Sequence, residues 1–334
     1  MKQDVDLESV VPVDGGTSRS TYLCCDGTRR LVLKVFPGRS WRSVSTEVRI
    51  LQRISQEHGS VFVGPISSRP ERWLDAWGYR YPYIGGNVLG IDGEFRPHSG
   101  SSVKELGHVV ALAARDLSGV WRGSWPAPRV VSGLRCELTE AGNLLRRKLP
   151  RRLVGAVLST IRACMETLNI VRGRLRVQHV HGDIHAGNVI VPTRGGAKVI
   201  DTSGLRVRIA VREIAAALAK VTSLQGQPHS NVLDDWRFTL AGYLDGATIL
   251  PVEVGLVPVA VGAKLVGELC YLLQLQRDGV WDKRQELLFM GSAHGCQVLS
   301  VLFKELVEVV NTERLAQGGA AVGARENGGG SCDT

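Results

Sequence analysis

The chain has 334 residues, of which 44% are hydrophobic and 22% are charged, and its formal net charge is +9. This length allows one large or two ordinary domains, and the composition is that of a folded protein rather than a disordered or fibrous one. No apolar stretch opens the sequence, and two prolines and Glu253 interrupt the longest apolar run, 248–263, so we expect neither a signal peptide nor a membrane span.

The seven cysteines are scattered along the chain, their number is odd, and no two of them have the CxxC spacing of metal sites and redox centres. This usage is typical of reduced thiols, and it predicts a cytoplasmic protein.

The N-terminal part predicts a small antiparallel sheet. Three segments rich in apolar and β-branched residues read as its strands: 10–13, 21–25 and 30–36. The polar loop between the first two strands contains Gly15, Gly16 and Ser18. An Asp-Gly pair, a strong hairpin signal, separates the second strand from the third.

Lys34 is a lone cation inside the apolar third strand. A lysine in this setting is either an exposed edge charge or a paired functional cation. Residues 40–54 follow, and their apolar side chains recur at the spacing of one helix face. Glu47 lies in this expected helix, thirteen residues after Lys34, where it either faces solvent beside neighbouring arginines or pairs with the lysine.

Beyond this helix we expect two more strands, at 61–63 and 79–84, and then a crossing into a mainly helical part. The expected helices are 103–120, 138–148, 153–171, 210–223, 231–244, 261–277 and 281–311, and the expected short strands are 177–180, 189–192 and 197–200. Residues 316–334 are rich in Gly and Ala without periodicity, which predicts a disordered tail.

The most informative stretch runs from 177 to 204. Asp183 and Asn188 flank a short loop before one apolar run, and Asp201 ends the next. This arrangement suits phosphoryl transfer, because one carboxylate can orient an attacking hydroxyl and accept its proton. An amide oxygen and a second carboxylate are ligands that Mg²⁺ prefers. We therefore predict Asp183 as the catalytic base and Asn188 and Asp201 as the metal ligands.

His181-Gly182-Asp183, followed by Asn188 and then by Ile200-Asp201, resembles the catalytic and metal-binding segments of the protein-kinase-like fold. It is closer to the aminoglycoside phosphotransferase family, in the small-molecule kinase branch, than to protein kinases. Gly182 stands where protein kinases carry Arg, and Thr202 replaces the Phe that follows their metal Asp. Glu213-Ile214-Ala215 is similar to the Asp-Ile-Ala of these phosphotransferases, and we expect Glu213 to brace the loop.

The resemblance implies an α+β fold with two lobes. The N-lobe, 1–86, would be an antiparallel sheet with one helix that binds ATP, and the mainly helical C-lobe, 87–315, would hold the catalytic loop and the acceptor pocket. In such a kinase Lys34, fixed by Glu47, neutralises phosphate charge. The remaining nucleotide contacts would come from Gly15, Gly16 and Ser18 over the phosphates, and from backbone near 82–85 against the base.

The acceptor is expected to be a hydroxyl of a small molecule, such as an antibiotic, a sugar or a choline-like compound, or of a peptide. The basic chain favours a neutral or anionic acceptor, although aminoglycosides stay open. Acidic residues on the later helices could line an acceptor pocket, and the candidates are Asp234, Asp235, Asp245 and Glu268.

Three questions remain open at this level. The chain could be a degenerate kinase-like module that binds nucleotide without transferring phosphate, which its weak glycine loop would favour. His179, His181 and His185 could instead form the Zn²⁺ site of a metal-dependent hydrolase.

The basic segment 146–176 is either a solvated helix surface, which we favour, or an anion-binding surface. It lacks interleaved aromatic residues, which counts against nucleic acid as a partner.

Overall fold

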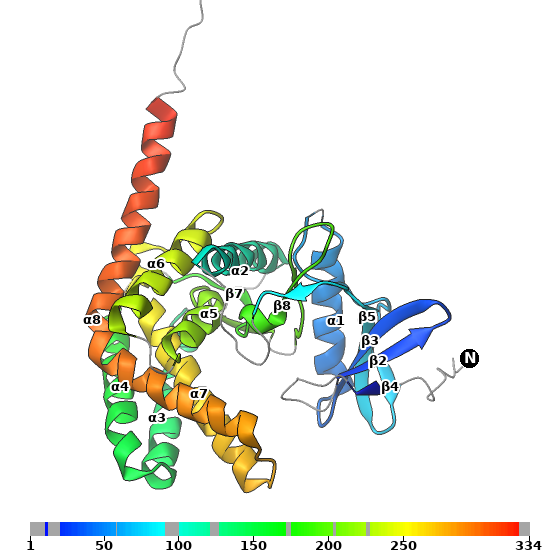
Figure 1. The fold of residues 1–334 in the computed structure, drawn as a ribbon, viewed down its shortest axis with the longest axis horizontal. Helices are drawn as coiled ribbons and strands as arrows, with labels where there is room; N and C mark the ends of the chain where they lie inside the picture. Colours follow the sequence, from blue (N-terminus) through cyan, green and yellow to red (C-terminus); the bar gives the residue numbers. More distant parts are fainter. Residues whose placement is uncertain are drawn as a thin grey trace, which may run out of the picture.

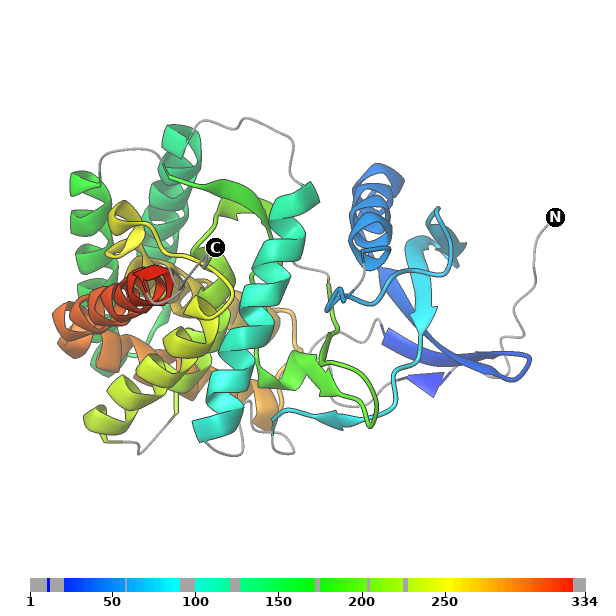
Figure 2. The same cartoon turned by 90° about the horizontal axis from the view of Figure 1, so that it is seen from above.

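The computed structural model describes residues 11–12, 21–57, 59–90, 100–120, 127–171, 175–202, 205–224 and 228–326. Two lobes are evident in Figures 1 and 2, a small one built on a sheet and a larger helical one, and short strands lie between them. The predicted two-lobed α+β fold is confirmed.

The small lobe is a five-stranded antiparallel sheet with strand order β1-β2-β3-β5-β4, covered by helix α1. Its strands are β1 (Val11–Pro12), β2 (Thr21–Asp26), β3 (Arg29–Phe36), β4 (Glu71–Trp73) and β5 (Ala76–Pro82), and α1 spans Trp41–Ser55. Ser40 caps α1 by accepting a hydrogen bond from the Ser43 amide at 3.3 Å. In the sheet register Lys34 lies opposite Tyr79 on the neighbouring strand.

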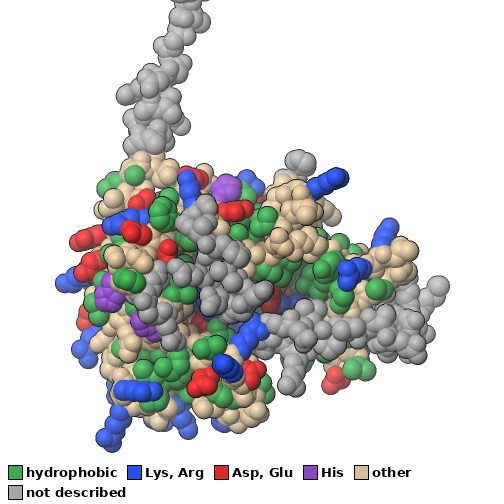
Figure 3. All heavy atoms as spheres, viewed as in Figure 1, with side chains coloured by type: hydrophobic (Ala, Val, Ile, Leu, Met, Phe, Trp, Pro, Cys, Tyr) green, Lys and Arg blue, Asp and Glu red, His purple; other side chains and the backbone are tan. Residues whose placement is uncertain are grey.

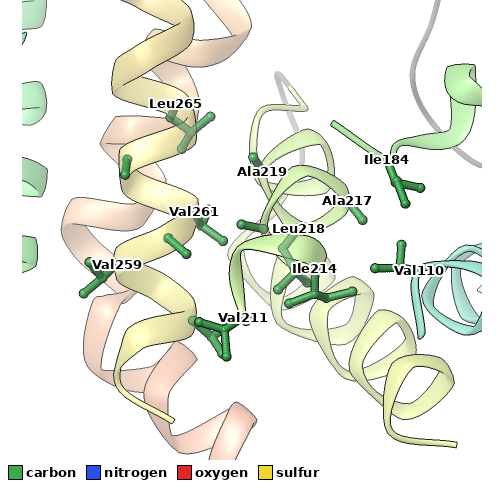
Figure 4. Packing of buried hydrophobic residues seen from close by; sticks show 14 of the residues in the cluster. Val110, Ile184, Val211, Ile214, Ala217, Leu218, Ala219, Val259, Val261 and Leu265 are labelled. Carbon is green, nitrogen blue, oxygen red and sulfur yellow. The ribbon is translucent and has the colours of Figure 1, made fainter. Parts of the chain in front are cut away.

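The helical lobe is held by a continuous apolar core. Its helices are α2 (Gly100–Val120), α3 (Ala127–Lys148), α4 (Arg151–Ile170), α5 (Arg212–Thr222), α6 (His229–Leu244), α7 (Leu256–Arg277) and α8 (Lys283–Glu326). In Figure 4, α5 lies between α7 and the segment of Ile184, so that Val261 of α7 and Leu218 of α5 meet in the core.

Helices α2 and α6 cross at two glycines. A Cβ at Gly107 would lie 2.0 Å from the Thr239 carbonyl oxygen, and a Cβ at Gly242 would lie 1.9 Å from the Lys104 carbonyl oxygen. Real side chains cannot approach this closely, so the two backbones pack directly and any larger residue would push the helices apart.

Short strands carry the predicted catalytic stretch between the lobes. One antiparallel sheet has the order β6-β8-β9, and a second pairs β7 with β10. These strands are β6 (Asn87–Val88), β7 (Val177–Val180), β8 (Val189–Val191), β9 (Lys198–Val199) and β10 (Arg206–Ile209), and the 3₁₀ turn Ala186–Asn188 precedes β8. The predicted strand at 61–63 is reduced to a single bridge between Phe62 and Val199.

Two expectations need correction. Helix α7 begins at Leu256 rather than 261, because Pro258 is accommodated in the first turn, where no intrahelical N–H bond is lost. The expected disordered tail from 316 is wrong in its first part, since α8 continues to Glu326. Among the residues that the structure describes, three helical segments are long and apolar enough to cross a membrane, by length and composition alone: Arg151–Ile170, Pro251–Arg277 and Lys283–Gln317.

The most apolar of these three segments is Pro251–Arg277, and 67% of its most apolar window is buried inside the protein. Its apolar side chains therefore build the core of the helical lobe.

The described cysteines are all free thiols. In the basic segment, the arginines and lysines at 146–148, 151, 152 and 162 are exposed at helix ends and on a helix face. Figure 3 shows charges of both signs interspersed with apolar side chains on the visible face.

Candidate active site

Lys34 connects the sheet of the small lobe to the catalytic stretch. The strand buries its side chain to 2% exposure, and the ammonium is bonded to the Asp201 carboxylate. Asp201 comes after β9 and has a φ of +58°, a left-handed backbone conformation that L-residues other than Gly adopt at a cost. This conformation, together with the lysine, fixes the carboxylate at the junction of the lobes. The structure thus brings together two residues that lie 167 positions apart.

Glu47 does not form the direct ion pair with Lys34 that the sequence predicted. Its carboxylate accepts a hydrogen bond from Arg39 Nη1 at 2.8 Å and another from the Tyr79 hydroxyl, also at 2.8 Å. The Tyr79 oxygen in turn lies 2.6 Å from Oγ1 of Thr202, the residue that follows Asp201 in the sequence. Burial raises the pKa of Glu47, and the Arg39 guanidinium opposes that rise. Glu47 therefore joins α1 to the catalytic segment through a tyrosine rather than through the lysine.

The loop that carries Asp183 is shaped by Gly182 and held from below by a glutamate. Gly182 has a φ of +70°, which suits a residue without a side chain. Glu213, at the start of α5, is fully buried and accepts backbone N–H bonds from His181 at 2.7 Å and from Gly182 at 3.4 Å. Burial raises the pKa of Glu213 to about 8. The expected bracing role of Glu213 matches this geometry.

Asn188 and Asp183 are also brought together. The side-chain amide of Asn188 donates a hydrogen bond to the Asp183 carbonyl oxygen at 3.0 Å, and the Asn188 carbonyl oxygen accepts one from Ile200 at 2.9 Å. Asn188 thus ties the loop of Asp183 to the segment after β9 that contains Asp201. Because the amide nitrogen is engaged, the side-chain oxygen is the atom left for a cation.

Lys264 was not anticipated from the sequence. Its Nζ lies 2.6 Å from Asp183 Oδ1, and the two side chains are 23% and 40% exposed. Burial alone would raise the pKa of Asp183, but the Lys264 ammonium holds it well below its usual range, so the carboxylate stays ionised. The available signal was a lone lysine within the apolar helix around 256–266, the same pattern that singled out Lys34 in its strand.

A more deeply buried ion pair, Lys220–Glu268, lies in the electrostatic surroundings of the Lys264–Asp183 pair. Lys220 of α5 donates to Glu268 Oε1 at 2.6 Å, and Ser292 donates to Glu268 Oε2 at 2.9 Å. Burial lowers the pKa of His185 to about 4, so this neighbouring imidazole is neutral near pH 7. Asp183 is therefore surrounded by two lysines, Lys264 and Lys220, and by one further carboxylate, that of Glu268.

The histidines serve the loop backbone. Nδ1 of His181 accepts from the Asp183 amide at 3.3 Å, and Nδ1 of His185 accepts from the Gly187 amide at 3.1 Å. In the described part of the chain, no three His, Cys, Asp or Glu side chains are grouped as they would be around a metal ion. The Zn²⁺ site considered for His179, His181 and His185 therefore finds no support in this geometry.

A divalent cation of the Mg²⁺ type fits Asn188 and Asp201 better. Both offer hard oxygen donors, the Asn188 nitrogen is turned away to a carbonyl, and the Asp201 side chain is 36% exposed. Gly15, Gly16 and Ser18 lie outside the described residues. Residues 82–85, expected against the base of the nucleotide, lead from β5 to β6 and so connect the lobes.

The acidic acceptor-pocket candidates are mostly paired with basic residues. Asp234 accepts from Arg237 at 2.6 Å, Asp245 lies 3.2 Å from Lys104, and Glu268 is paired with Lys220. Of these three, Glu268 is the one that shares a helix with Lys264 and lies in its electrostatic surroundings.

Comparison with solved structures identifies the fold. The chain is similar to an amicoumacin kinase, with 16% identity, a TM-score of 0.61 and coverage of 87% of this chain and 88% of the other. It is also similar to an aminoglycoside phosphotransferase from Alicyclobacillus acidocaldarius, with 14% identity, a TM-score of 0.56 and coverage of 92% and 96%. A choline kinase from Streptococcus pneumoniae gives 13% identity, a TM-score of 0.54 and coverage of 86% and 92%.

A comparison with curated protein sequences finds no match. The model of the phosphotransferase enzyme family matches residues 9–243, which is more than two thirds of the sequence and includes Lys34, Asp183, Asn188 and Asp201. The chain therefore belongs to the phosphotransferase enzyme family, whose aminoglycoside phosphotransferase-like members it resembles, and is a kinase-type phosphotransferase that acts on hydroxyl groups.

Proposed function

We propose that this protein transfers the γ-phosphoryl group of ATP, with Mg²⁺ as the cation, to a hydroxyl group of a small molecule or peptide. The observation that carries the proposal is the meeting of Lys34 and Asp201 beside the loop of Asp183 and Asn188. These four groups are the cation, base and oxygen ligands that phosphoryl transfer requires. Solved structures with this fold include an amicoumacin kinase in complex with AMP-PNP and Ca²⁺ and an aminoglycoside 2'-phosphotransferase in complex with GDP.

Each residue has a distinct task. Asp183, kept ionised, orients the acceptor hydroxyl and takes its proton. Lys34 neutralises charge on the phosphate groups, and Asn188 and Asp201 hold the cation. When bound, the cation supplies positive charge to the phosphate oxygens and so stabilises charge that develops during transfer. Positioning and electrostatics account for most of the rate enhancement in this chemistry.

Further assignments belong to the same proposal. We assign nucleotide binding to residues 1–86 and the catalytic loop and acceptor pocket to 87–315. The glycine loop with Gly15, Gly16 and Ser18 would cover the phosphates. Glu47 would act on Lys34 indirectly, through α1 and Tyr79. The protein would work in the cytoplasm, where ATP and reduced thiols are available.

The test is Mg²⁺-dependent phosphate transfer from ATP by the wild type and by Asp183→Asn, across a panel of antibiotics, choline, sugars and hydroxyl peptides. Loss of the base should lower turnover by about 10²- to 10⁴-fold and leave the dissociation constant for ADP within about threefold. The matched control is Asp278→Asn, since Asp278 is an exposed aspartate at the C-terminal end of α7 and lies beside Arg277.

Retained turnover in Asp183→Asn would contradict the assignment of the base. Tight nucleotide binding without transfer to any acceptor would instead favour a degenerate nucleotide-binding module. Absence of nucleotide binding by the wild type would overturn the proposed function altogether.

A further inference from the structure

The group beside the proposed base is a cation. Lys264 Nζ is bonded to Asp183 Oδ1 at 2.6 Å, and the partly exposed side chains can both be reached from solvent. Lys264 is held in place because the adjacent Leu265 and the neighbouring turn of α7 pack in the core against α5. Burial opposes the charge on Lys264, but Asp183 raises its pKa, so the ammonium is charged at neutral pH.

The distance limits what an acceptor can carry next to its hydroxyl. A hydroxyl that donates to Asp183 lies roughly 2.7 Å from a carboxylate oxygen. If that oxygen is Oδ1, the hydroxyl oxygen lies within about 5.3 Å of Lys264 Nζ, the sum of this distance and the ion-pair distance. Substituents on the carbon that bears the reacting hydroxyl, or on the next carbon, are therefore within range of direct contact with the Lys264 ammonium.

Apart from Asp183, the carboxylate near Lys264 is already paired with another cation. Glu268, one turn further along α7, is engaged by Lys220 and Ser292 through its two oxygens. Lys264 is thus compensated by Asp183 itself. When Asp183 takes the acceptor proton, the carboxylate becomes neutral and the ammonium is left without its counter-charge. At that stage an anionic substituent would be stabilised, and a cationic one would be repelled.

Resting on the proposed function, we propose that the natural acceptor carries a negatively charged group close to its reacting hydroxyl, and that Lys264 is the residue that selects it. In the transfer, the acceptor oxygen forms a bond to the γ-phosphorus while the bond from that phosphorus to the β–γ bridging oxygen breaks. The hydroxyl proton passes to Asp183, and ADP leaves. Lys264 takes no part in bond making; it binds the anionic substituent.

The experiment uses three serine derivatives that present the same hydroxyl with different charge. They are N-acetylserine, which is anionic, N-acetylserinamide, which is neutral, and serinamide, which is cationic. Each is offered to the full chain with Mg²⁺ and ATP as an acceptor, and each is also measured as an inhibitor of the phosphate release from ATP to water. The variants are Lys264→Met, which removes the charge, and Lys264→Arg, which keeps it. Thermal unfolding identifies any variant that fails to fold.

In the wild type we expect N-acetylserine to be used or bound at least about tenfold better than serinamide, with the neutral compound between them. Lys264→Met should reduce this ratio at least about fivefold, and Lys264→Arg should retain it. A residue that only positions Asp183 would lower all three activities equally and leave the ratio unchanged, and that result would overturn the inference. Equal use of the three compounds by the wild type would overturn it as well.

Failure of the proposed function would be recognised separately. In that case the wild type would not bind nucleotide, or its phosphate transfer and release would equal those of Asp183→Asn, and this inference would fall with it. If nucleotide is turned over through Asp183 but the charge order is absent or independent of residue 264, only the inference about the acceptor fails. If Lys264→Met does not fold, the charge order in the wild type and its retention in Lys264→Arg still decide the outcome.

Discussion

The buried Glu213 offers a test of the site that needs no knowledge of the acceptor. Its carboxyl group is fully buried under the catalytic loop, and burial raises its pKa from 4.5 to about 8. Between these two values the folded chain holds a proton on Glu213 that the unfolded chain has released. Stability from this group is therefore fully present below about pH 4.5 and is lost as the pH rises through about 8.

The substitution Glu213→Gln removes this dependence, because the amide is neutral at every pH and still offers one carbonyl oxygen to the loop. Each pH unit in which the proton numbers differ by one changes the unfolding free energy by about 1.36 kcal/mol. From pH 5.5 to pH 7.5 the wild type should therefore lose about 2–3 kcal/mol relative to the variant. At pH 5.5 the neutral carboxyl and the amide should be similar in stability.

The assay is urea unfolding of both proteins at pH 5.5, 6.5 and 7.5, followed by tryptophan fluorescence. The matched control is Glu305→Gln, an exposed glutamate on α8, which should differ from the wild type by a constant amount across the window. A constant difference for Glu213→Gln would refute the reasoning, since it would mean that the loop is held by a permanently ionised carboxylate.

Three further predictions concern the lobes and their junction. Tyr79→Phe removes the buried hydroxyl that joins α1 to the catalytic segment, and it should lower the unfolding free energy by about 1–3 kcal/mol in the same urea assay; unchanged stability would contradict the role of that hydroxyl. Gly107→Ala places a methyl group 2.0 Å from a backbone carbonyl oxygen of α6 and should lower the unfolding free energy by at least about 2 kcal/mol. Gly267→Ala is the control: its Cβ meets nothing within 4 Å, so it should raise the unfolding free energy by up to about 1 kcal/mol. Equal effects of the two substitutions would argue against the close helix crossing. Lys34→Met should weaken ADP binding measured by calorimetry at least about tenfold, since a buried counter-charge for phosphate is lost, while Lys304→Met on the exposed face of α8 should leave it unchanged; equal affinities would remove Lys34 from the nucleotide site.

Local patterns were sufficient to predict the main frame of the molecule. The lone Lys34 in an apolar strand, the catalytic loop and the position of Glu213 all follow from a few consecutive residues, because strand alternation and turn chemistry are local properties. The strands β4, β6 and β10, which the sequence did not predict, are too short for a period to be recognised. The helical continuation of α8 was missed because its glycines suggested a loop, although alanine, arginine and glutamate in the same stretch favour helix.

The partners of the predicted residues could not be predicted in the same way. Glu47 was expected to pair with Lys34, but its carboxylate bonds to Arg39 and Tyr79 instead. Which of these three neighbours becomes its partner depends on side-chain packing rather than on sequence spacing. Lys264 meets Asp183 across 81 residues of sequence. Such a contact is set by how α7 packs against α5, and no short motif encodes it.

The contact between Lys34 and Asp201 has a thermodynamic consequence for the two proposed ligands. In the structure Lys34, proposed to bind phosphate, and Asp201, proposed to bind the metal, neutralise each other. A divalent cation at Asp201 weakens the hold on Lys34, and phosphate groups at Lys34 release the carboxylate. Each ligand alone must leave one charge without its partner, whereas both together compensate both charges. Metal and nucleotide are therefore expected to bind with positive cooperativity, and by linkage the factor by which each strengthens the other must be the same.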